Sequence, residues 1–254
     1  MNKRYIQSIL WFLLFVPFCH AQEKTSPPPL NCDDCRSEKP NRFRIVIDPG
    51  HGGIDTGAQA EGVSEKDITL AISLLLGKEL QKRGCDIVFT RTDDRFVSLS
   101  NRARLVNRTK PDLFISIHVN SVYSPSAHGF EIWIRKGGDP ESENLAHCIR
   151  RNLVPAIPSI DRGVKNNKSL QVLSQTHCPA GLVELGFITH KIERSRLIHP
   201  KWQKTYAEAI AKGVKNFLDS KSAGKKNSEL RKIRKFTLNR RFKKRSKPFP
   251  GLKK

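Results

Sequence analysis

Two histidines and one glutamate stand where predicted strands or helices begin or end, so their side chains can converge on one site. His51 follows the first predicted strand on a glycine-rich loop, and His118 stands at the end of a strongly apolar run. Glu65 opens the first predicted helix. Two histidines and one carboxylate are a common ligand set for catalytic zinc, because they leave a fourth position for water. Together they favour a metal site held by His51, Glu65 and His118.

A second glutamate, Glu184, lies in an apolar run, between Val183 and Leu185. Burying a carboxylate there is costly, and burial raises its pKa, which suits a general base near neutral pH. Ordinary structural interpretations stay open for each residue. Glu65 could be a first-turn acid favoured by the helix dipole, and His118 could be a core histidine. Glu184 could pair with an arginine such as Arg162.

The elements that must position these residues alternate between strands and helices, which indicates an α/β domain with a largely parallel sheet. The helices are predicted from Ser64 to Gly84 and at Ser98–Asn107, Glu141–Leu153 and Lys201–Leu218. The strands are predicted at Phe43–Ile47, Asp86–Thr90, Asp112–Val119, Gly129–Arg135, Ser169–Leu173 and Gly181–Leu185.

The N-terminal segment differs from this domain in composition. A positive start and a short apolar stretch at Ile9–Phe18 predict a signal peptide over residues 1–21, so we expect an exported, periplasmic or extracellular protein. Residues 22–41 are rich in proline and contain Cys32 and Cys35 in a C-x-x-C pattern. We interpret them as a linker with a local disulfide, before a single domain at residues 42–220.

The net charge of +22 is concentrated at the C-terminus, where Lys221–Lys254 has 15 Lys or Arg and one acid, Glu229. We predict a disordered basic tail that binds an anionic envelope surface. A solvated tail without a partner is the alternative. Nucleic acid is not an expected partner, because the chain carries an export signal and lacks a basic motif with interleaved aromatic residues.

The motifs resemble those of the zinc-dependent N-acetylmuramoyl-L-alanine amidases of bacterial cell walls, over about residues 43–219. The resemblance implies that His51, Glu65 and His118 bind zinc and that Glu184 is catalytic. It also implies a twisted mixed sheet of about six strands flanked by helices. The matching segments are Asp48–Gly53 with Asp55 and Gly57, Glu65-Lys66, Ser116–Asn120 and Val183–Ile188, joined by segments around Thr90-Arg91, Arg102 and Pro111-Asp112.

By this resemblance, the substrate is peptidoglycan and the bond cut joins the lactyl group of N-acetylmuramic acid to L-alanine. A zinc carboxypeptidase or endopeptidase acting within the stem peptide is the alternative. His190 departs from the asparagine that the family often has, and we interpret it as a helix cap. The turn between Arg135 and Glu141 is too short for the inhibitory insertion of some relatives, which predicts an open site. The sequence specifies no protein activator.

Overall fold

The structure is a computed structural model that describes residues 42–167 and 170–245. Within residues 225–229 and 232–245 it describes the backbone alone. The predicted signal peptide and the Cys32–Cys35 linker lie outside the described residues. In the described part of the chain, every helix is too short or too polar to cross a lipid bilayer.

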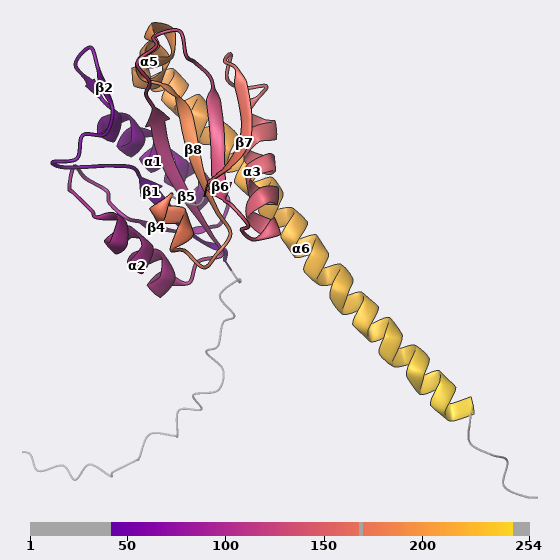
Figure 1. Cartoon of the computed structure of the whole chain (residues 1–254). Coiled ribbons are helices and arrows are strands. Elements are labelled where there is room, and N and C mark those ends of the chain that lie inside the picture. Colours follow the sequence, from indigo (N-terminus) through magenta and orange to yellow (C-terminus); the bar gives the residue numbers. More distant parts are fainter. Residues whose placement is uncertain (1–41, 168–169, 246–254) are drawn as a thin grey trace, which may run out of the picture. The chain divides into compact units, whose positions relative to one another are not determined.

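A six-stranded mixed sheet forms the centre of the domain, as predicted (Figure 1). Every neighbouring pair of strands is parallel except β6 and β8. A separate two-stranded hairpin lies in the loop between the first strand and the first helix. In spatial order, the sheet strands are β4 (Asp86–Phe89), β1 (Arg44–Pro49), β5 (Leu113–Asn120), β8 (Ala180–Phe187), β6 (Phe130–Arg135) and β7 (Asp161–Asn167), and the hairpin strands are β2 (Gln59–Ala60) and β3 (Val63–Ser64).

Helices cover the two faces of this sheet unequally. One face packs against α1 (Glu65–Lys82), α3 (Pro140–Leu153) and α6 (Pro200–Arg245), in a core that includes Ile115 and Val183. The other face is covered by the shorter helices α2 (Leu99–Thr109) and α4 (Gln171–Ser174), in a smaller core around Phe114 and Leu182. Helix α5 (Lys191–Ile198) follows β8. Successive strand residues point to opposite faces, so the alternating polar residues of β5 and β8 share the second face.

The strand predicted at Ser169–Leu173 is wrong. Its described part forms α4, in which Val172 and Leu173 pack against the second face of the sheet. The edge strand beside β6 is instead β7, in a segment where the sequence predicted neither a strand nor a helix. Its sequence, DRGVKNN, is polar, which an edge strand tolerates because it has only one strand neighbour and is partly exposed. A short apolar run alone does not distinguish a strand from a buried helical turn.

The disorder predicted from Lys221 is contradicted as far as Arg245, because α6 continues to that residue. The last fully buried residues described in this helix are Phe217 and Leu218, so its packing against the domain ends where the sequence predicted. Beyond them the chain is rich in Lys and Arg, which are good helix formers, and has no proline before Pro248. Residues 246–254 lie outside the described part.

Candidate functional site

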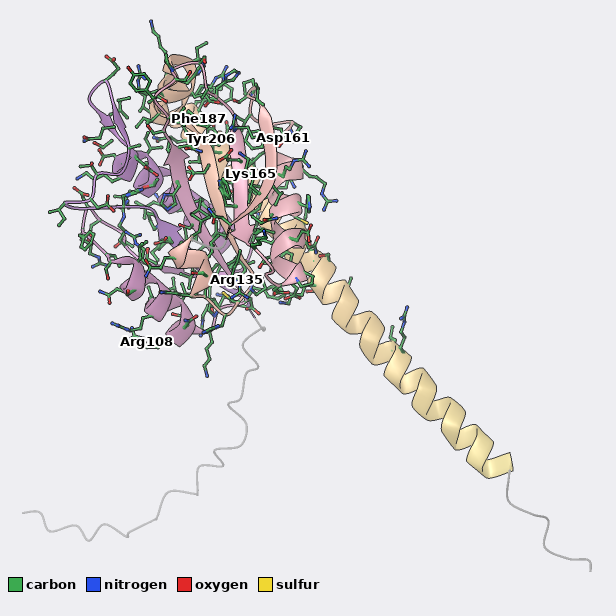
Figure 2. The ribbon with its side chains drawn as sticks, viewed as in Figure 1. Arg108, Arg135, Asp161, Lys165, Phe187 and Tyr206 are labelled. Atoms are coloured by element: carbon green, nitrogen blue, oxygen red, sulfur yellow. The ribbon has the colours of Figure 1, made fainter. Side chains whose placement is uncertain are left out.

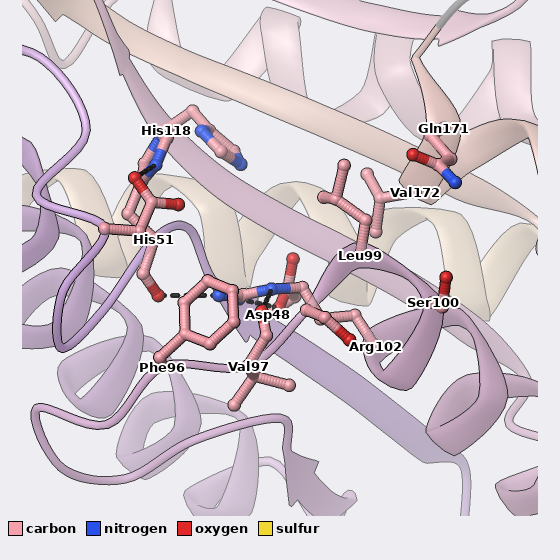
Figure 3. Close-up of a pocket in the computed structure, with 12 residues that line it drawn as sticks. Asp48, His51, Phe96, Val97, Leu99, Ser100, Arg102, His118, Gln171 and Val172 are labelled. Atoms are coloured by element: carbon pink, nitrogen blue, oxygen red, sulfur yellow. Dashed lines mark hydrogen bonds and ion pairs between the residues drawn. The ribbon is translucent and has the colours of Figure 1, made fainter.

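His51, Glu65 and His118 come together, as the sequence predicted (Figure 3 shows the two histidines). One ligand atom from each lies within 4.8 Å of the others. His51 Nε2 is 3.2 Å from Glu65 Oε2, and His118 Nδ1 is 3.0 Å from Glu65 Oε1. His51 follows β1, Glu65 begins α1 and His118 lies near the end of β5. The edge formed by the carboxyl ends of the parallel strands therefore assembles the three groups.

The loop after β1 holds His51 in an orientation suited to a metal ligand. His51 has φ = 60°, a left-handed conformation that is unusual for a residue with a side chain. Its Nδ1 donates to Asp55 Oδ1 at 2.9 Å, which directs Nε2 toward Glu65. Gly50 allows the loop to approach β5, because a Cβ there would lie 2.4 Å from the His118 ring.

A buried ion pair lies beneath this loop. Asp48 is fully buried and Arg102, on α2, is 3% exposed, with 2.6 Å between Asp48 Oδ1 and Arg102 Nη1. Arg102 also donates to the carbonyl oxygens of Pro49 and His51, at 2.7 and 2.6 Å. Arg91, which is fully buried, donates to the carbonyls of Pro49 and Gly50. The two arginines thus fix the backbone on both sides of the His51 loop.

The sequence reasoning placed Arg91 and Arg102 in connecting segments and assigned them no role. Their signal in the sequence is weak, because most arginines are exposed and nothing local marks these two as buried. Only the packing of α2 and of the segment after β4 against the loop brings their guanidinium groups to its carbonyls.

The pKa values of Glu65 and His51 depend strongly on the contacts among the three candidate ligands. Burial works to raise the pKa of Glu65, but hydrogen bonds from His118 and His51 hold this pKa well below its usual range. Burial works to lower the pKa of His51, but contacts with Glu65 and Asp55 raise it to about 8. A buried carboxylate between two imidazoles is a suitable ligand set for a divalent cation. The cation would supply the positive charge that the protonated imidazoles provide in its absence. The described residues therefore fit a metal ion of the zinc type.

Glu184 lies beside this cluster on the same face of the sheet. It pairs with His118 across β5 and β8, and with Glu131 across β8 and β6. Its Oε2 is buried and has no hydrogen-bond partner among the described residues. Burial, with smaller contributions from the nearby carboxylates Glu65 and Glu131, raises its pKa to about 7. Arg162, the alternative partner, is bound to Glu131, so Glu184 is left available for a proton.

A cavity of about 400 Å³ opens beside the two histidines (Figure 3). It lies between the β1 loop, the start of α2 and the start of α4. Phe96, Val97, Leu99 and Val172 contribute apolar surface, while Ser100 and Gln171 contribute polar groups. Such a mixture suits a ligand with both apolar and hydroxyl-bearing parts.

Two further expectations concern the surroundings of the site. His190 is the N-cap of α5, and its Nδ1 accepts a hydrogen bond from the Glu193 amide, which confirms the helix-cap interpretation. The connection from β6 to α3 runs from Lys136 to Asp139, which leaves no room for an inhibitory helix.

Comparisons with known proteins agree with this geometry. The model of the family described as N-acetylmuramoyl-L-alanine amidase matches residues 45–216. The sporulation-specific N-acetylmuramoyl-L-alanine amidase of Bacillus subtilis is 34% identical over 187 residues, which cover 73% of this chain and 70% of the relative. An N-acetylmuramoyl-L-alanine amidase structure from Clostridium difficile 630 has 37% identity and a TM-score of 0.69, over 71% of this chain and 99% of that one. The CwlD amidase of Clostridioides difficile, solved in complex with the GerS lipoprotein, has 29% identity and a TM-score of 0.68, over 70% and 100% of the two chains.

Proposed function

We propose, since this chain belongs to the N-acetylmuramoyl-L-alanine amidase family, that it cleaves peptidoglycan with a zinc ion held by His51, Glu65 and His118. Glu184 is the catalytic acid and base. The bond cut is the amide between the lactyl group of N-acetylmuramic acid and L-alanine. The observation that carries the proposal is the convergence of three ligand atoms beside a buried carboxylate oxygen without a partner.

The roles of the residues follow from their positions. Bound zinc would lower the pKa of a water molecule and polarise the scissile carbonyl. Glu184 would accept the proton of the attacking water and donate it to the leaving amine. In the metal-free protein burial raises the pKa of Glu184 to about 7, so this carboxyl group is able to exchange protons near neutral pH. Asp55 and Arg102 would keep His51 oriented while the reaction proceeds.

Metal analysis of two variants tests these roles. His51→Ala should lose both zinc and activity. Glu184→Gln should keep zinc and the fold but lose catalysis by about 10²-fold or more, the typical contribution of a general base. Loss of zinc by Glu184→Gln would make Glu184 a ligand, and full zinc occupancy in His51→Ala would refute the ligand assignment.

Digestion of purified muropeptides tests the bond that is cut. Mass spectrometry of the products should show intact stem peptides and sugars with free lactyl groups. Release of D-alanine, or of fragments cut within the stem, would instead support the carboxypeptidase or endopeptidase alternative.

We further propose that the protein is exported and that its basic C-terminal segment holds it at an anionic envelope surface. Export is supported by the composition of residues 1–21 and by the extracytoplasmic substrate of the family. The segment carries 15 Lys or Arg and one acid, and α6 extends through its first 25 residues, Lys221–Arg245. The sequence of this segment is strongly basic and has no hydrophobic period, which suits an anionic surface more than a pocket.

Binding to sacculi or anionic vesicles at several salt concentrations tests the anchoring. The full chain should bind at low salt and dissociate as salt rises, because exposed charges are screened over about 8 Å at physiological ionic strength. A chain that ends at Ser220 should keep its fold and bind much less. Equal, salt-insensitive binding by both forms would assign the anchoring to the domain. The GerS complex of CwlD concerns that relative, and we propose no activator for this chain.

A further inference from the structure

A second buried carboxylate, Glu131 on β6, lies next to Glu184 and has no direct role in the mechanism above. Its side chain is 2% exposed and accepts hydrogen bonds from four side chains. Asn120 and Trp133 donate to Oε1, at 3.0 and 2.9 Å. Arg162 donates to Oε2 at 2.8 Å, and Lys165 donates to the same oxygen. One carboxylate therefore fixes two cationic side chains of β7.

The positive charge of these two side chains exceeds the negative charge of Glu131. Arg162 and Lys165 together carry two positive charges against the single negative charge of Glu131. Their side chains remain 35% and 32% exposed, so both reach the solvent. Arg162 uses Nε for Glu131, and its two terminal nitrogens have no protein acceptor in the described residues. A partly exposed guanidinium with unused N–H groups can take a second carboxylate in a bidentate manner.

Aromatic rings also restrict both cations. The Arg162 guanidinium carbon lies 5.0 Å from the centre of the Phe187 ring, and Lys165 Nζ lies 5.3 Å from the centre of the Trp133 ring. Figure 2 places Lys165 on β7 and Phe187 at the end of β8. Side chains held in this way lose little conformational entropy when they bind a ligand. The arrangement is therefore that of a preformed anion site.

The register of the sheet gives the direction in which the substrate must lie. His118, Glu184 and Glu131 are successive cross-strand neighbours on β5, β8 and β6, and neighbouring strands are about 4.8 Å apart. The scissile carbonyl must lie near the candidate metal ligands, and the leaving nitrogen must lie within hydrogen-bond reach of Glu184. The line from carbonyl to nitrogen therefore points from β5 toward β6 and β7.

The peptide part of the substrate continues along this line, and the sugar part lies on the opposite side, toward the cavity near Phe96 and Leu99. The first stem residue, L-alanine, supplies the leaving nitrogen. The second residue begins about 3.8 Å further along the peptide, because consecutive Cα atoms have that spacing. The stem peptide continues through the side-chain carboxyl of this second residue, which leaves its α-carboxyl group free. A stem peptide that lies along this line would bring that group beside the side chains clustered around Glu131.

We propose that Arg162 and Lys165, held by Glu131, bind the free α-carboxylate of the second stem residue and select for peptidoglycan in which this group is not amidated. The proposal rests on the amidase function above and deepens it. Glu131 is a positioning residue, whereas Arg162 and Lys165 touch the substrate. A purely structural ion-pair cluster would instead be indifferent to the chemistry of the second stem residue.

Two muramyl tetrapeptides that differ only at this position, one with a carboxylate and one with a primary amide, test the proposal. Wild-type zinc enzyme should show a kcat/KM at least about tenfold higher for the carboxylate form, the value of one charge-assisted hydrogen bond. Arg162→Met should lose this preference, through a lower kcat/KM for the carboxylate form alone. Lys165→Met should act in the same direction, and Arg162→Lys should retain part of the preference.

Arg150→Met is the matched control. Arg150 forms an ion pair with Asp161 of β7, at 2.7 Å. The variant therefore loses a comparable contact with the same strand, but outside the proposed subsite. The preference for the carboxylate form should survive in this variant. Circular dichroism and zinc content should match the wild type for every variant compared.

Calorimetric titration with the two free tetrapeptides gives a readout that does not depend on turnover. The carboxylate peptide should bind wild type at least about tenfold more tightly than the amide peptide, by the same contact, and Arg162→Met should bind both equally. The inference is overturned if wild type treats the two forms alike, or if Arg162→Met weakens both to the same extent. If neither substrate is cleaved, the amidase proposal fails. The subsite inference is tested separately by calorimetry, and equal affinities of wild type for the two peptides overturn it.

Discussion

Replacing Arg102 with methionine should be among the most destabilising single changes in this domain. Methionine fills much of the same space but leaves the Asp48 carboxylate buried without its cation, and Asp48 is fully buried. Removal of one partner of a buried ion pair costs about 3–5 kcal/mol. The variant also loses hydrogen bonds to the carbonyls of Val97, Pro49 and His51. A typical domain is stable by about 5–15 kcal/mol, so this loss is a large share of the total.

Urea unfolding of the metal-free protein, followed by circular dichroism, measures this loss without a contribution from zinc binding. Arg104→Met is the matched control, because Arg104 is an exposed residue of the same helix whose side chain bonds to Asn101. Its free energy of unfolding should change by no more than about 0.5 kcal/mol. The reasoning is refuted if Arg102→Met costs less than about 1 kcal/mol, the value expected for an exposed pair.

A double-variant cycle separates the ion pair from the other contacts of Arg102. Asp48→Asn in the Arg102→Met background removes the uncompensated charge, so the double variant should be less destabilised than the sum of the two single variants. Simple additivity would mean that the two side chains do not interact energetically.

The remaining predictions concern Glu184 and Gly50. The pKa of Glu184 is raised from its usual value to about 7, so its ionisation reduces the stability of the metal-free protein as pH rises from about 4.5 through 7. Glu184→Gln should therefore raise the free energy of unfolding at pH 8 by up to about 3 kcal/mol, with no such gain at pH 4. An equal gain at both pH values would show that ionisation of Glu184 is not the cause. Gly50→Ala places a Cβ 2.4 Å from the His118 ring and should weaken zinc binding by at least about tenfold in a chelator competition. Gly181→Ala, whose Cβ would lie 3.8 Å from its nearest neighbour, should bind zinc as wild type does.

The sequence was sufficient for the candidate ligands because each stands beside a local signal. His51 follows a strand and a proline-glycine turn, and Glu65 follows the helix-capping position Ser64. His118 lies near the end of a largely apolar strand. In an α/β domain such ends share one edge of the sheet, so the convergence of these residues follows from their order.

The features that were not predicted depend on contacts between distant segments. Arg91 and Arg102 are buried because other segments pack over them, and their own neighbours in the sequence give no sign of it. Strand β7 is polar and partly exposed, so it lacks the apolar residues from which the other strands were predicted. The helical continuation of α6 was missed because charge density indicates solvent exposure and does not exclude helix.

The register of β6, β8 and β5 also explains how two neighbouring carboxylates acquire different protonation behaviour. Glu131 and Glu184 are direct cross-strand partners on one face of the sheet. Although burial works to raise the pKa of Glu131, hydrogen bonds from Lys165, Arg162 and Trp133 lower it below the usual range. Glu184 receives no such donors at Oε2, and the charge of Glu131 adds to the effect of burial in raising its pKa to about 7. The cations of β7 therefore do two things at once. They keep Glu131 ionised, so that its charge adds to the larger effect of burial on the pKa of Glu184, and they present positive charge to the proposed carboxylate of the second stem residue.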